Sequence, residues 1–400
     1  MEVKPGYKQT EVGVIPEDWE VKPLGDLLAN AMQNGVFNEP SRKGKGTKLI
    51  NVIDLYRRFP IDPSDLLRFD ASRDELIRFG VRKGDIFFTR SSITPDGIAQ
   101  CNVFDGDTVE PLVFDCHIIR VQADPRKFDP LYLARYCTSR PARQFLVANA
   151  KTTTMTTVDQ SVISNLPVAF PPLSEQRAIA TALSDVDGLL GGLDRLIAKK
   201  RDLKQAAMQQ LLTGQTCLPG FHAEWEVKQL GEIAHIKTGS RNNEDKVEDG
   251  QYPFFVRSEV VERINNYSHD CEAILVPGEG RIGDIFHYIN GRFDVHQRVY
   301  AITKFVPGIS GRFIHFFLAK NFGAWAMQNT VKATVDSLRL PTFQKFKMRL
   351  PPTEAEQTAI ASVLTEMDTE LALLTQRREK TRALKQAMMQ ELLTGKTRLI

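Results

Sequence analysis

The sequence lacks any long apolar run. Nowhere in its 400 residues does an uninterrupted apolar stretch approach the length of about 18 residues that a membrane span requires. The first residues, 1–6, contain neither an apolar segment nor the small residues of a cleavage site. We therefore expect no membrane helix and no secretion signal.

Cysteine is scarce and widely spaced. The five cysteines include no C-x-x-C pair: they are Cys101, Cys116, Cys137, Cys217 and Cys271. Their odd number and spacing support neither a disulfide framework nor a zinc ribbon. We interpret them as reduced thiols of a cytoplasmic protein.

The chain also lacks a strong excess of charge of one sign. It has 52 Lys and Arg against 49 Asp and Glu, for a net charge of +3. This balance does not by itself indicate a nucleic-acid partner, although a local basic patch still could. The length indicates two or three domains, each able to bury a core, and hydrophobic content of 42% is ordinary for a globular protein.

Motifs for cofactor binding are incomplete. Residues 278–283 match G-x-G-x-x-G, but a strand rather than a helix is expected to follow. Gly395-Lys396-Thr397 resembles the end of a P-loop, but no glycine stands at position 390. The Pro-Pro pairs at 171–172 and 351–352 lack the flanking residues of an amino-methyltransferase motif. We therefore predict no cofactor in this chain.

Catalytic and metal-binding sets are missing as well. His287 and His296 lie in a strand-rich region with no third ligand at metal spacing, so structural roles are the better interpretation. No nucleophile, base and acid stand out together. The sequence predicts no catalytic residue and no metal ligand, and it reads as a binding protein.

What the chain does contain is a long internal repeat. Residues 203–216 recur as residues 384–397 with eleven of fourteen positions identical. Upstream, 170–176 matches 350–357, and Trp225–Gly231 matches Trp19–Gly25. Such a repeat indicates two copies of one module. The predicted order is a first variable region 1–169 with an N-terminal segment 1–18, a helix 170–216, a second variable region 217–349, and a helix 350–400.

The repeated segments predict two long helices. Ser174 and Thr353 can cap their starts, and Gly214 and Gly395 can end them, giving about 40 residues and roughly 60 Å each. Apolar residues follow the 4-3 spacing of a coiled coil. The pattern then drifts to Leu203, Met208 and Leu211, matched by Leu384, Met389 and Leu392. The predicted helix-pairing residues are Ile179, Leu183, Val186, Leu190 and Leu193 in the first copy, and Ile360, Leu364, Met367, Leu371 and Leu374 in the second.

Two arrangements of these helices stay open. One helix alone cannot bury its own apolar stripe, so the two copies can pair with each other. The folded domain between them makes an antiparallel pair geometrically easy. Alternatively, each helix packs on its own domain. The fold class is α+β: two mixed α/β globular domains separated by two long antiparallel coiled-coil helices in a pseudo-twofold, circular repeat.

The two variable regions share little identity. In each, an apolar strand runs into a polar loop with an arginine, at 84–92 and at 272–281. We also expect strands at 113–121 and 297–302 and amphipathic helices around 130–146 and 311–328. Each region ends in a segment rich in Lys and Thr.

Candidate DNA contacts are basic, amide and hydroxyl side chains on loops. Arg, Asn, Gln and Ser/Thr suit base edges, whereas Lys mostly neutralises phosphate. For any one residue a solvated surface charge is the competing interpretation, and the basic runs on the helices are equally explained as coiled-coil flanks. The candidates are Lys43, Lys45, Lys48, Arg57, Arg58, Arg90, Ser91, Ser92, Lys151, Thr152 and Thr153 in the first region, and Arg241, Asn242, Arg257, Arg281, Arg292, Gln297, Arg298 and Lys332 in the second.

The doubled W-E-V-K-x-L-G, P-P-x-x-E-Q and L-K-Q-A-x-M-Q-x-L-L-T-G segments resemble the specificity (S) subunit of type I restriction-modification systems over essentially the whole chain. The resemblance implies that the variable regions are target recognition domains, each reading one half of a bipartite, asymmetric double-stranded DNA target. It implies that the helices set the spacer and dock methyltransferase (M) subunits carrying S-adenosylmethionine. Restriction (R) subunits using ATP and Mg would bind through M, and the S chain itself would not be an enzyme.

Two other functions remain as alternatives. One is a coiled-coil adaptor whose two globular heads bind proteins. The other is a single-chain restriction or methylation enzyme, which would require activity from the purified chain with a methyl donor.

Overall fold

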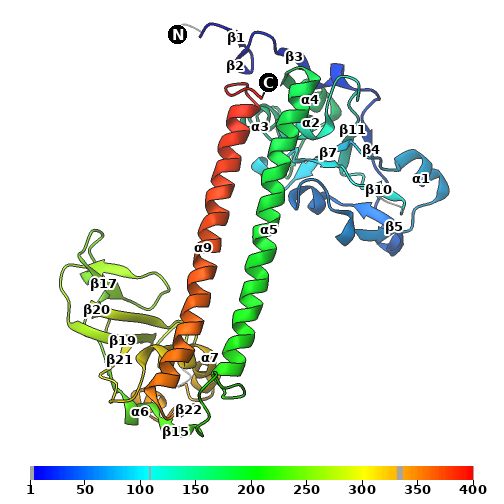
Figure 1. The fold of residues 1–400 in the computed structure, drawn as a ribbon. Helices are drawn as coiled ribbons and strands as arrows, with labels where there is room; N and C mark the ends of the chain where they lie inside the picture. Colours follow the sequence, from blue (N-terminus) through cyan, green and yellow to red (C-terminus); the bar gives the residue numbers. More distant parts are fainter. Residues whose placement is uncertain (1–3, 108–109, 331–336, 400) are drawn as a thin grey trace. The chain divides into compact units, whose positions relative to one another are not determined.

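The computed structural model describes residues 4–107, 110–330 and 337–399 (Figure 1). The chain forms two compact units. Unit 1 comprises Met1–Asp194 and Arg377–Ile400, and unit 2 comprises Arg195–Gln376. None of the helices in the described ranges combines the length and apolar character needed to cross a membrane.

Unit 1 is built from short sheets. Its central sheet has the order β4-β11-β7-β9 and is antiparallel, and in a second sheet β10 runs parallel to β5. The buried apolar run 85–89 forms the inner strand β7. The strands are β1 Tyr7–Thr10, β2 Gly13–Pro16, β3 Glu20–Pro23, β4 Gln33–Asn34, β5 Lys43–Ile50, β6 Leu67–Phe69, β7 Asp85–Thr89, β8 Ser91–Ser92, β9 Cys101–Phe104, β10 Leu112–Phe114, β11 Ile118–Val121, β12 Lys151–Thr152, β13 Thr156–Thr157 and β14 Pro167–Phe170.

Two sequence expectations for unit 1 need correction. The strand expected at 113–121 is two strands, β10 and β11, because a turn at Asp115 interrupts it. The helix expected at 130–146 is also divided, because Pro141 has no amide to continue a helix and stands in the first turn of a new one. The helices of this unit are α1 Arg73–Phe79, α2 Pro130–Cys137, α3 Arg140–Ala148 and α4 Gln160–Ser164, with 3-10 turns η1 Leu24–Leu27, η2 Pro40–Arg42, η3 Val52–Tyr56, η4 Pro63–Asp65 and η5 Pro95–Gly97.

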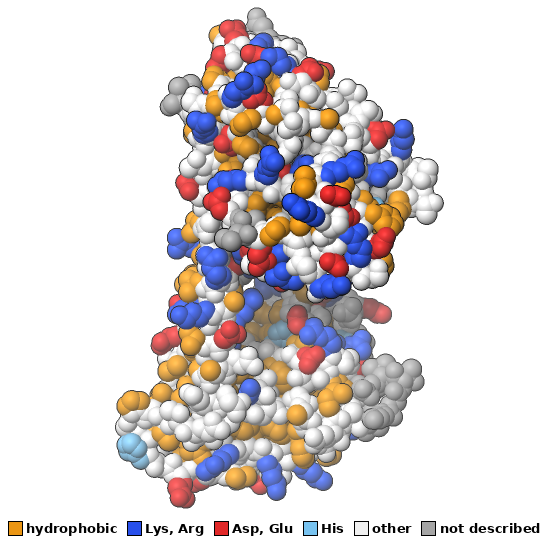
Figure 2. Space-filling model, turned by 90° about the vertical axis from the view of Figure 1, so that its right-hand side faces the viewer, with side chains coloured by type: hydrophobic (Ala, Val, Ile, Leu, Met, Phe, Trp, Pro, Cys, Tyr) orange, Lys and Arg blue, Asp and Glu red, His pale blue; other side chains and the backbone are white. Residues whose placement is uncertain are grey.

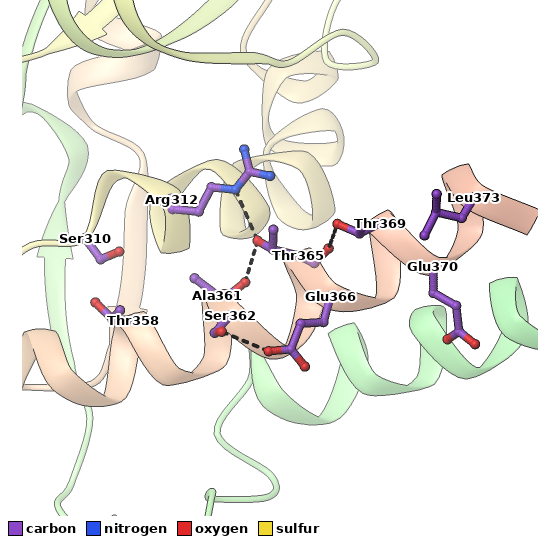
Figure 3. A pocket seen from close by; sticks show the side chains of 10 residues that line it. All are labelled: Ser310, Arg312, Thr358, Ala361, Ser362, Thr365, Glu366, Thr369, Glu370 and Leu373. Carbon is purple, nitrogen blue, oxygen red and sulfur yellow. Dashed lines mark hydrogen bonds between the residues drawn. The ribbon is translucent and has the colours of Figure 1, made fainter. Parts of the chain in front are cut away.

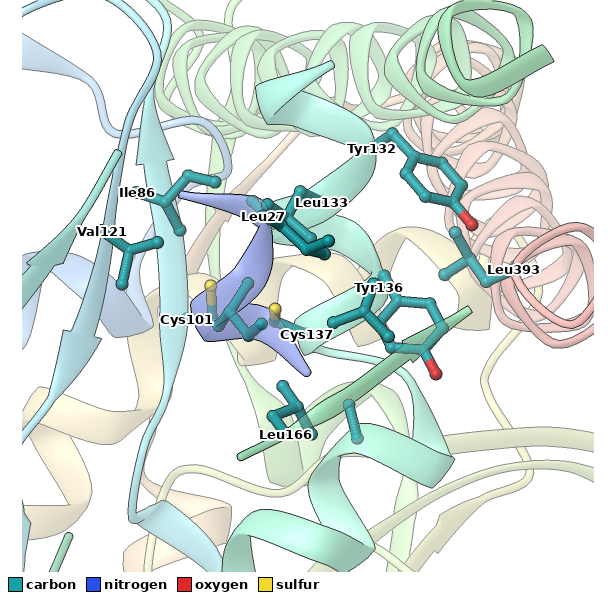
Figure 4. Packing of buried hydrophobic residues seen from close by; sticks show 14 of the residues in the cluster. Leu27, Ile86, Cys101, Val121, Tyr132, Leu133, Tyr136, Cys137, Leu166 and Leu393 are labelled. Carbon is teal, nitrogen blue, oxygen red and sulfur yellow. The ribbon is translucent and has the colours of Figure 1, made fainter. Parts of the chain in front are cut away.

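The core of unit 1 joins distant parts of the chain. Tyr132 and Tyr136 of α2 are buried, and the Tyr132 hydroxyl donates to the Ala169 carbonyl at 2.9 Å. Leu392 and Leu393, more than 200 residues later, belong to the same core (Figure 4). The C-terminal segment is therefore part of the first globular domain.

Unit 2 contains a six-stranded sheet with the order β16-β21-β19-β20-β17-β18. The long central strand β19 pairs antiparallel with both β20 and β21. The strands are β15 Glu226–Gln229, β16 His235–Thr238, β17 Tyr252–Phe255, β18 Glu262–Ile264, β19 His269–Pro277, β20 His287–Val295, β21 Val299–Thr303 and β22 Lys347–Leu350. The strand β20 follows the glycines of 278–283, so no helix completes a dinucleotide motif there.

An aromatic cluster fills the core of unit 2. Phe313 and Phe322 of α7 are fully buried, and Phe322 stacks on Phe343 with ring centroids 5.0 Å apart. The expected helix at 311–328 is confirmed as α7. The helices of this unit are α6 Leu230–Ile233, α7 Gly311–Gln328 and α8 Leu340–Gln344, with the 3-10 turn η6 Asn243–Asp245.

The two long helices are α5 Leu173–Leu211 and α9 Glu354–Leu392. The Thr353 hydroxyl accepts from the Glu356 amide at 3.4 Å, as its spacing predicted. The prediction for Ser174 was wrong: α5 begins before it, at Leu173, and the Pro172 carbonyl accepts from the Glu175 and Gln176 amides at 3.0 and 3.1 Å. Gly214 and Gly395 both have φ of +70°, which suits the glycine that ends a helix.

Each unit contains a stretch of both helices (Figure 1). In unit 1, Lys385 pairs with Asp187 at 2.6 Å and Arg378 with Asp194 at 3.4 Å. The two helices are therefore antiparallel within unit 1. In unit 2 the salt bridges Lys204–Asp368 and Lys200–Glu370 likewise show that the helices are antiparallel.

The expected helix-pairing residues are buried most deeply near the helix starts. Ile179 and Leu183 are fully buried and pack into the globular core of unit 1, as Ile360 and Leu364 do in unit 2. Leu193 is 5% exposed, and the remaining members are half-buried: Val186, Leu190, Met367, Leu371 and Leu374. The expected drift of the seam is confirmed at Leu211 and Leu392, which are 7% and 4% exposed, but it was wrong at Leu203 and Leu384, which are 45% and 56% exposed.

Candidate nucleic-acid interface

The framing strands of each variable region pair with each other. β3, from the first W-E-V-K segment, pairs with β14 before the first Pro-Pro, and β15 pairs with β22 before the second. The first and last strands of each variable region are therefore hydrogen-bonded neighbours, and we call this paired edge the base of the unit. The loops between the framing strands are free to carry different side chains.

In unit 1 the fold brings two predicted groups together. β8 pairs with β13, and β13 pairs with β12, so Ser91 and Ser92 join Lys151 and Thr152 in one small sheet. Thr153 lies in the hairpin between β12 and β13. These hydroxyls and the exposed Arg90 form a polar surface from segments about 60 residues apart.

The β10–β11 turn belongs to the same surface. The Arg90 amide donates to the His117 carbonyl at 2.8 Å, and the Val158 amide donates to the Arg90 carbonyl at 3.0 Å. His117 is exposed. We call this set of Arg90–Ser92, the turn 115–118 and the hairpin 151–157 the unit 1 cluster.

In unit 2 a matching set gathers around a carboxylate. Glu279 pairs with Arg257 at 3.3 Å and with Arg298 at 3.1 Å. The side-chain amide of Gln297 donates to Oδ1 of Asn242. The neighbouring residue Arg241 pairs with Asp294 at 3.2 Å. Arg281, two residues after Glu279, pairs with Glu259 at 2.8 Å. We call this set the unit 2 cluster; it contains most of the residues predicted for the second region.

Several candidates lie outside these clusters. Lys43 is at the start of β5, before a bulge that places both Lys43 and Thr47 opposite Phe69, whereas the turn contacts the other end of β5 at Ile50. Lys45 pairs with Asp70 and Lys48 with Glu110. Lys332 lies outside the described residues.

Three arginines also stand apart from the turns. Arg57 pairs with Asp54 and Arg58 with Asp62 beside η3 and η4. Arg292 pairs with Asp270 on the β19–β20 ladder and stacks over the Tyr267 ring, 5.0 Å from its centroid.

The electrostatics are mixed rather than uniformly basic. Figure 2 shows Lys and Arg side chains interspersed with Asp and Glu over the visible face. Burial, and then the charges of Arg257 and Arg298, lower the pKa of His296 below its ordinary value. His296 is thus a neutral, buried group behind the unit 2 cluster, which agrees with the expected structural role.

One set of three side chains in the described part of the chain could hold a metal ion. Asp115, Cys116 and His117 place one ligand atom each within 4.8 Å of one another. The same contacts have a simpler explanation, because Asp115 accepts from the His117 amide at 2.7 Å and closes the turn. The corresponding turn of unit 2 forms with different residues.

Sequence reasoning missed several members of these clusters. Cys116 and His117 were hidden inside an apolar stretch that resembled one continuous strand. Glu279 was not considered because only basic, amide and hydroxyl side chains were sought. Two exposed apolar residues outside the clusters, Phe37 and Ile93, were missed as well, because apolar residues are usually buried; they are 70% and 87% exposed. The polar interruption at Asp115 was the only sequence signal for the turn.

A separate groove lies on α9. It has a volume of about 540 Å³ and runs between the start of α7 and the outer face of α9 (Figure 3). Ala361, Thr365, Thr369 and Leu373 form its floor along one face of the helix, and Arg312 forms the opposite wall. Leu373 is 61% exposed.

The fold and the clusters define a protein with two similarly framed units that present different polar side chains. A family model, the type I restriction modification DNA specificity domain, matches residues 16–197 and 222–382. The chain belongs to this family. It has the expected pair of specificity domains.

Known proteins agree with this assignment. The chain is 24% identical to a putative type I restriction enzyme MjaX specificity subunit of Methanocaldococcus jannaschii, over 98% of this chain and 97% of that protein. It is 32% identical to the Escherichia coli EcoDI specificity subunit over 35% of this chain and 30% of that protein. The type I S subunit of M. genitalium has the same fold, with a TM-score of 0.67, 16% identity and 98% of both chains covered. The expectation of a specificity subunit rather than an enzyme is confirmed by these relatives.

Proposed function

We propose that each unit reads one half of a bipartite, asymmetric double-stranded DNA target. The observation that carries this proposal is the pair of clusters: each is built on equivalent strands, and the two differ in side chains. Phosphate contacts would position each unit, and base-edge contacts would specify the sequence. Unlike clusters imply unlike half-sites.

We infer that the two helices pair as an antiparallel coiled coil and relate the units by a pseudo-twofold axis. The salt bridges found in both units support this arrangement, since Lys204–Asp368 and Lys385–Asp187 join repeat-equivalent residues. The helices would then fix the spacer between the half-sites. The domain boundaries predicted from the sequence stay predictions.

The M subunits are proposed to dock on the helices. The groove on α9 offers an exposed apolar surface for a partner helix, with Leu373 at its end. The equivalent face of α5 carries Gly188 and Gly192, where an added methyl would meet no atom within 4 Å. S-adenosylmethionine would come with M, and ATP and Mg with R subunits bound through M. The complex would act on genomic DNA in the cytoplasm.

The test is the methylated motif in cells that express this chain with its own M subunit. We expect a single motif of two unlike half-sites and a constant spacer. Purified complex should shift a duplex carrying that motif, and the affinity should fall steeply with salt. A complex that methylates without a bipartite motif contradicts the proposal, and failure to bind duplex DNA would favour the protein-binding adaptor.

A further inference from the structure

Each unit contains the same tight turn between two strands. The turns are residues 115–118, between β10 and β11, and residues 296–299, between β20 and β21. In both, the amide of the fourth residue donates to the carbonyl of the first, at 3.0 Å in unit 1 and 2.9 Å in unit 2. The two units share this geometry although their sequences differ here.

The first residue of each turn is buried and closes the turn with its side chain. In unit 1, Asp115 Oδ1 accepts from the His117 amide at 2.7 Å. In unit 2, His296 Nδ1 accepts from the Arg298 amide at 3.0 Å. A carboxylate and a neutral imidazole thus perform the same task. The conformation of the third residue is fixed from inside the protein.

Neighbouring segments anchor both turns in the same way. In unit 1 the His117 carbonyl accepts from the amide of Arg90, the first residue after β7, at 2.8 Å. In unit 2 the Arg298 carbonyl accepts from the amide of Gly278, the first residue after β19, also at 2.8 Å. The backbone amide of the second residue also donates in both units: that of Cys116 to the Val36 carbonyl at 2.9 Å, and that of Gln297 to the Arg241 carbonyl at 2.8 Å. The backbone is therefore a constant frame with hydrogen bonds on each side.

What the frame presents is different. The third residue is His117 in one unit and Arg298 in the other, and their side chains are 58% and 56% exposed. The second residue is Cys116 or Gln297. Because the backbone is equivalent, these positions can be exchanged without altering the fold.

The chemistry of Arg298 suits base recognition. A guanidinium can donate two parallel hydrogen bonds to guanine O6 and N7 in the major groove. Glu279 pairs with Arg298 at 3.1 Å and orients it from one side. A side chain on a rigid, hydrogen-bonded frame discriminates better than one on a mobile loop, because less geometry has to be ordered on binding.

We propose that the third residue of this turn, His117 in unit 1 and Arg298 in unit 2, is a specificity-determining side chain of its unit, and that Arg298 contacts a guanine edge. The proposal rests on the proposed function that each unit reads one half-site. Glu279 is a positioning residue for Arg298.

The test uses the full chain assembled with its M subunit, after the motif has been determined. Competition binding measures affinity for the motif and for duplexes with each base pair of either half-site changed. We expect Arg298→Ala to lose roughly tenfold to a hundredfold of the discrimination at one base pair of one half-site. The other half-site should be read as before. Arg298→Lys keeps the positive charge but lacks the planar guanidinium that donates two parallel hydrogen bonds, so it should lose the same discrimination.

Arg349→Ala is the matched control. Arg349 is an exposed arginine of the same unit that lies on the framing strand β22, opposite Val227, and belongs to neither the candidate DNA contacts nor the unit 2 cluster. We expect it to leave base preferences unchanged. His117→Ala should relax one position of the opposite half-site.

The possible failures are distinguishable. If the wild-type complex does not distinguish the motif from scrambled duplexes, the proposed function fails. If the wild type discriminates and Arg298→Ala weakens binding to all duplexes equally, Arg298 is a phosphate contact and the turn proposal alone is overturned. Thermal melting of each variant confirms that the units are folded.

Discussion

Arg398 makes two hydrogen bonds to the carboxylate of Glu175, both at 2.8 Å. Glu175 is buried at the start of α5, and Arg398 also pairs with Asp18 at 2.7 Å. Both carboxylates raise the pKa of Arg398. The C-terminal segment, the N-terminal segment and α5 are thus joined at one point of unit 1.

Replacing Arg398 should destabilise unit 1. Arg398→Ala leaves the Glu175 carboxylate buried without its cation, and breaking such a pair costs about 3 kcal/mol. We expect the melting temperature of unit 1 to fall by several degrees, measured by calorimetry or by circular dichroism. Unit 2 should melt as before.

The repeat supplies a control for this experiment. Cys217 occupies the position of Arg398 in the first copy and is exposed. Cys217→Ala should change stability by less than about 0.5 kcal/mol, as surface substitutions usually do. Equal losses from both variants would contradict a specific role of the ion pair.

His315 should make unit 2 sensitive to acid. Burial lowers the pKa of His315 to about 4, below the ordinary value near 6.5. Between these values the unfolded chain binds a proton that the folded chain does not, so stability falls as pH decreases from about 6.5 to about 4. The full effect is up to about 3 kcal/mol, and about 2 kcal/mol between pH 7 and pH 5.

Thermal melting at pH 7 and pH 5 measures this effect. Other groups titrate in the same range, so the difference between wild type and His315→Gln isolates the contribution of His315. We expect the variant to lose less stability on acidification than the wild type. Parallel pH dependence of the two proteins would show that His315 is not responsible.

Shortening both helices should shorten the DNA spacer. Residues 190–196 and 376–382 contain the two ends of the Arg378–Asp194 pair, so their joint deletion removes facing blocks. Seven residues correspond to about 10 Å of helix, or a spacer shorter by roughly one to three base pairs. The methylated motif should keep both half-sites. An unchanged spacer would refute the proposal that the helices fix the spacer length.

Two glycine substitutions provide a control of unchanged length. Gly188→Ala and Gly192→Ala introduce methyl groups into open space on α5. Each should stabilise the helix by about 1 kcal/mol. The spacer should stay the same, which separates helix length from helix stability.

Exchanging a whole variable region should change one half-site only. Residues 226–349 begin with β15 and end within β22, and the pairing of these strands joins Glu226 to Leu350. A region from another family member can therefore be grafted at the base of the unit. The motif should keep the half-site of unit 1 and the spacer, and a change in both halves would count against independent readers.

The sequence predicted the long helices well because their signals are local. The heptads, Thr353 and the two terminal glycines act within a few residues, and α5 and α9 end where expected. Periodicity alone does not tell which side of a helix is covered. Leu203 and Leu384 follow the apolar pattern and yet are exposed.

The clusters were predicted less well because they depend on pairing between distant strands. Arg90 and Lys151 were both candidates, but only the β8–β13–β12 sheet places them together. His117 was missed because it lies within a mostly apolar stretch, 113–121, that resembles one continuous strand. Lys43 was included on charge alone, and no local signal shows that it stands far from the turn.

The placement of Leu392 and Leu393 also has a consequence for synthesis on the ribosome. These residues complete a core whose other buried members lie between Ile15 and Leu183, so unit 1 can close only after Leu392 and Leu393 have been synthesised. Unit 2 consists of the continuous segment Arg195–Gln376 and can close earlier, although its synthesis begins later. A chain that stops before Leu392 would lack both leucines of this core and the Arg398 guanidinium that pairs with Glu175.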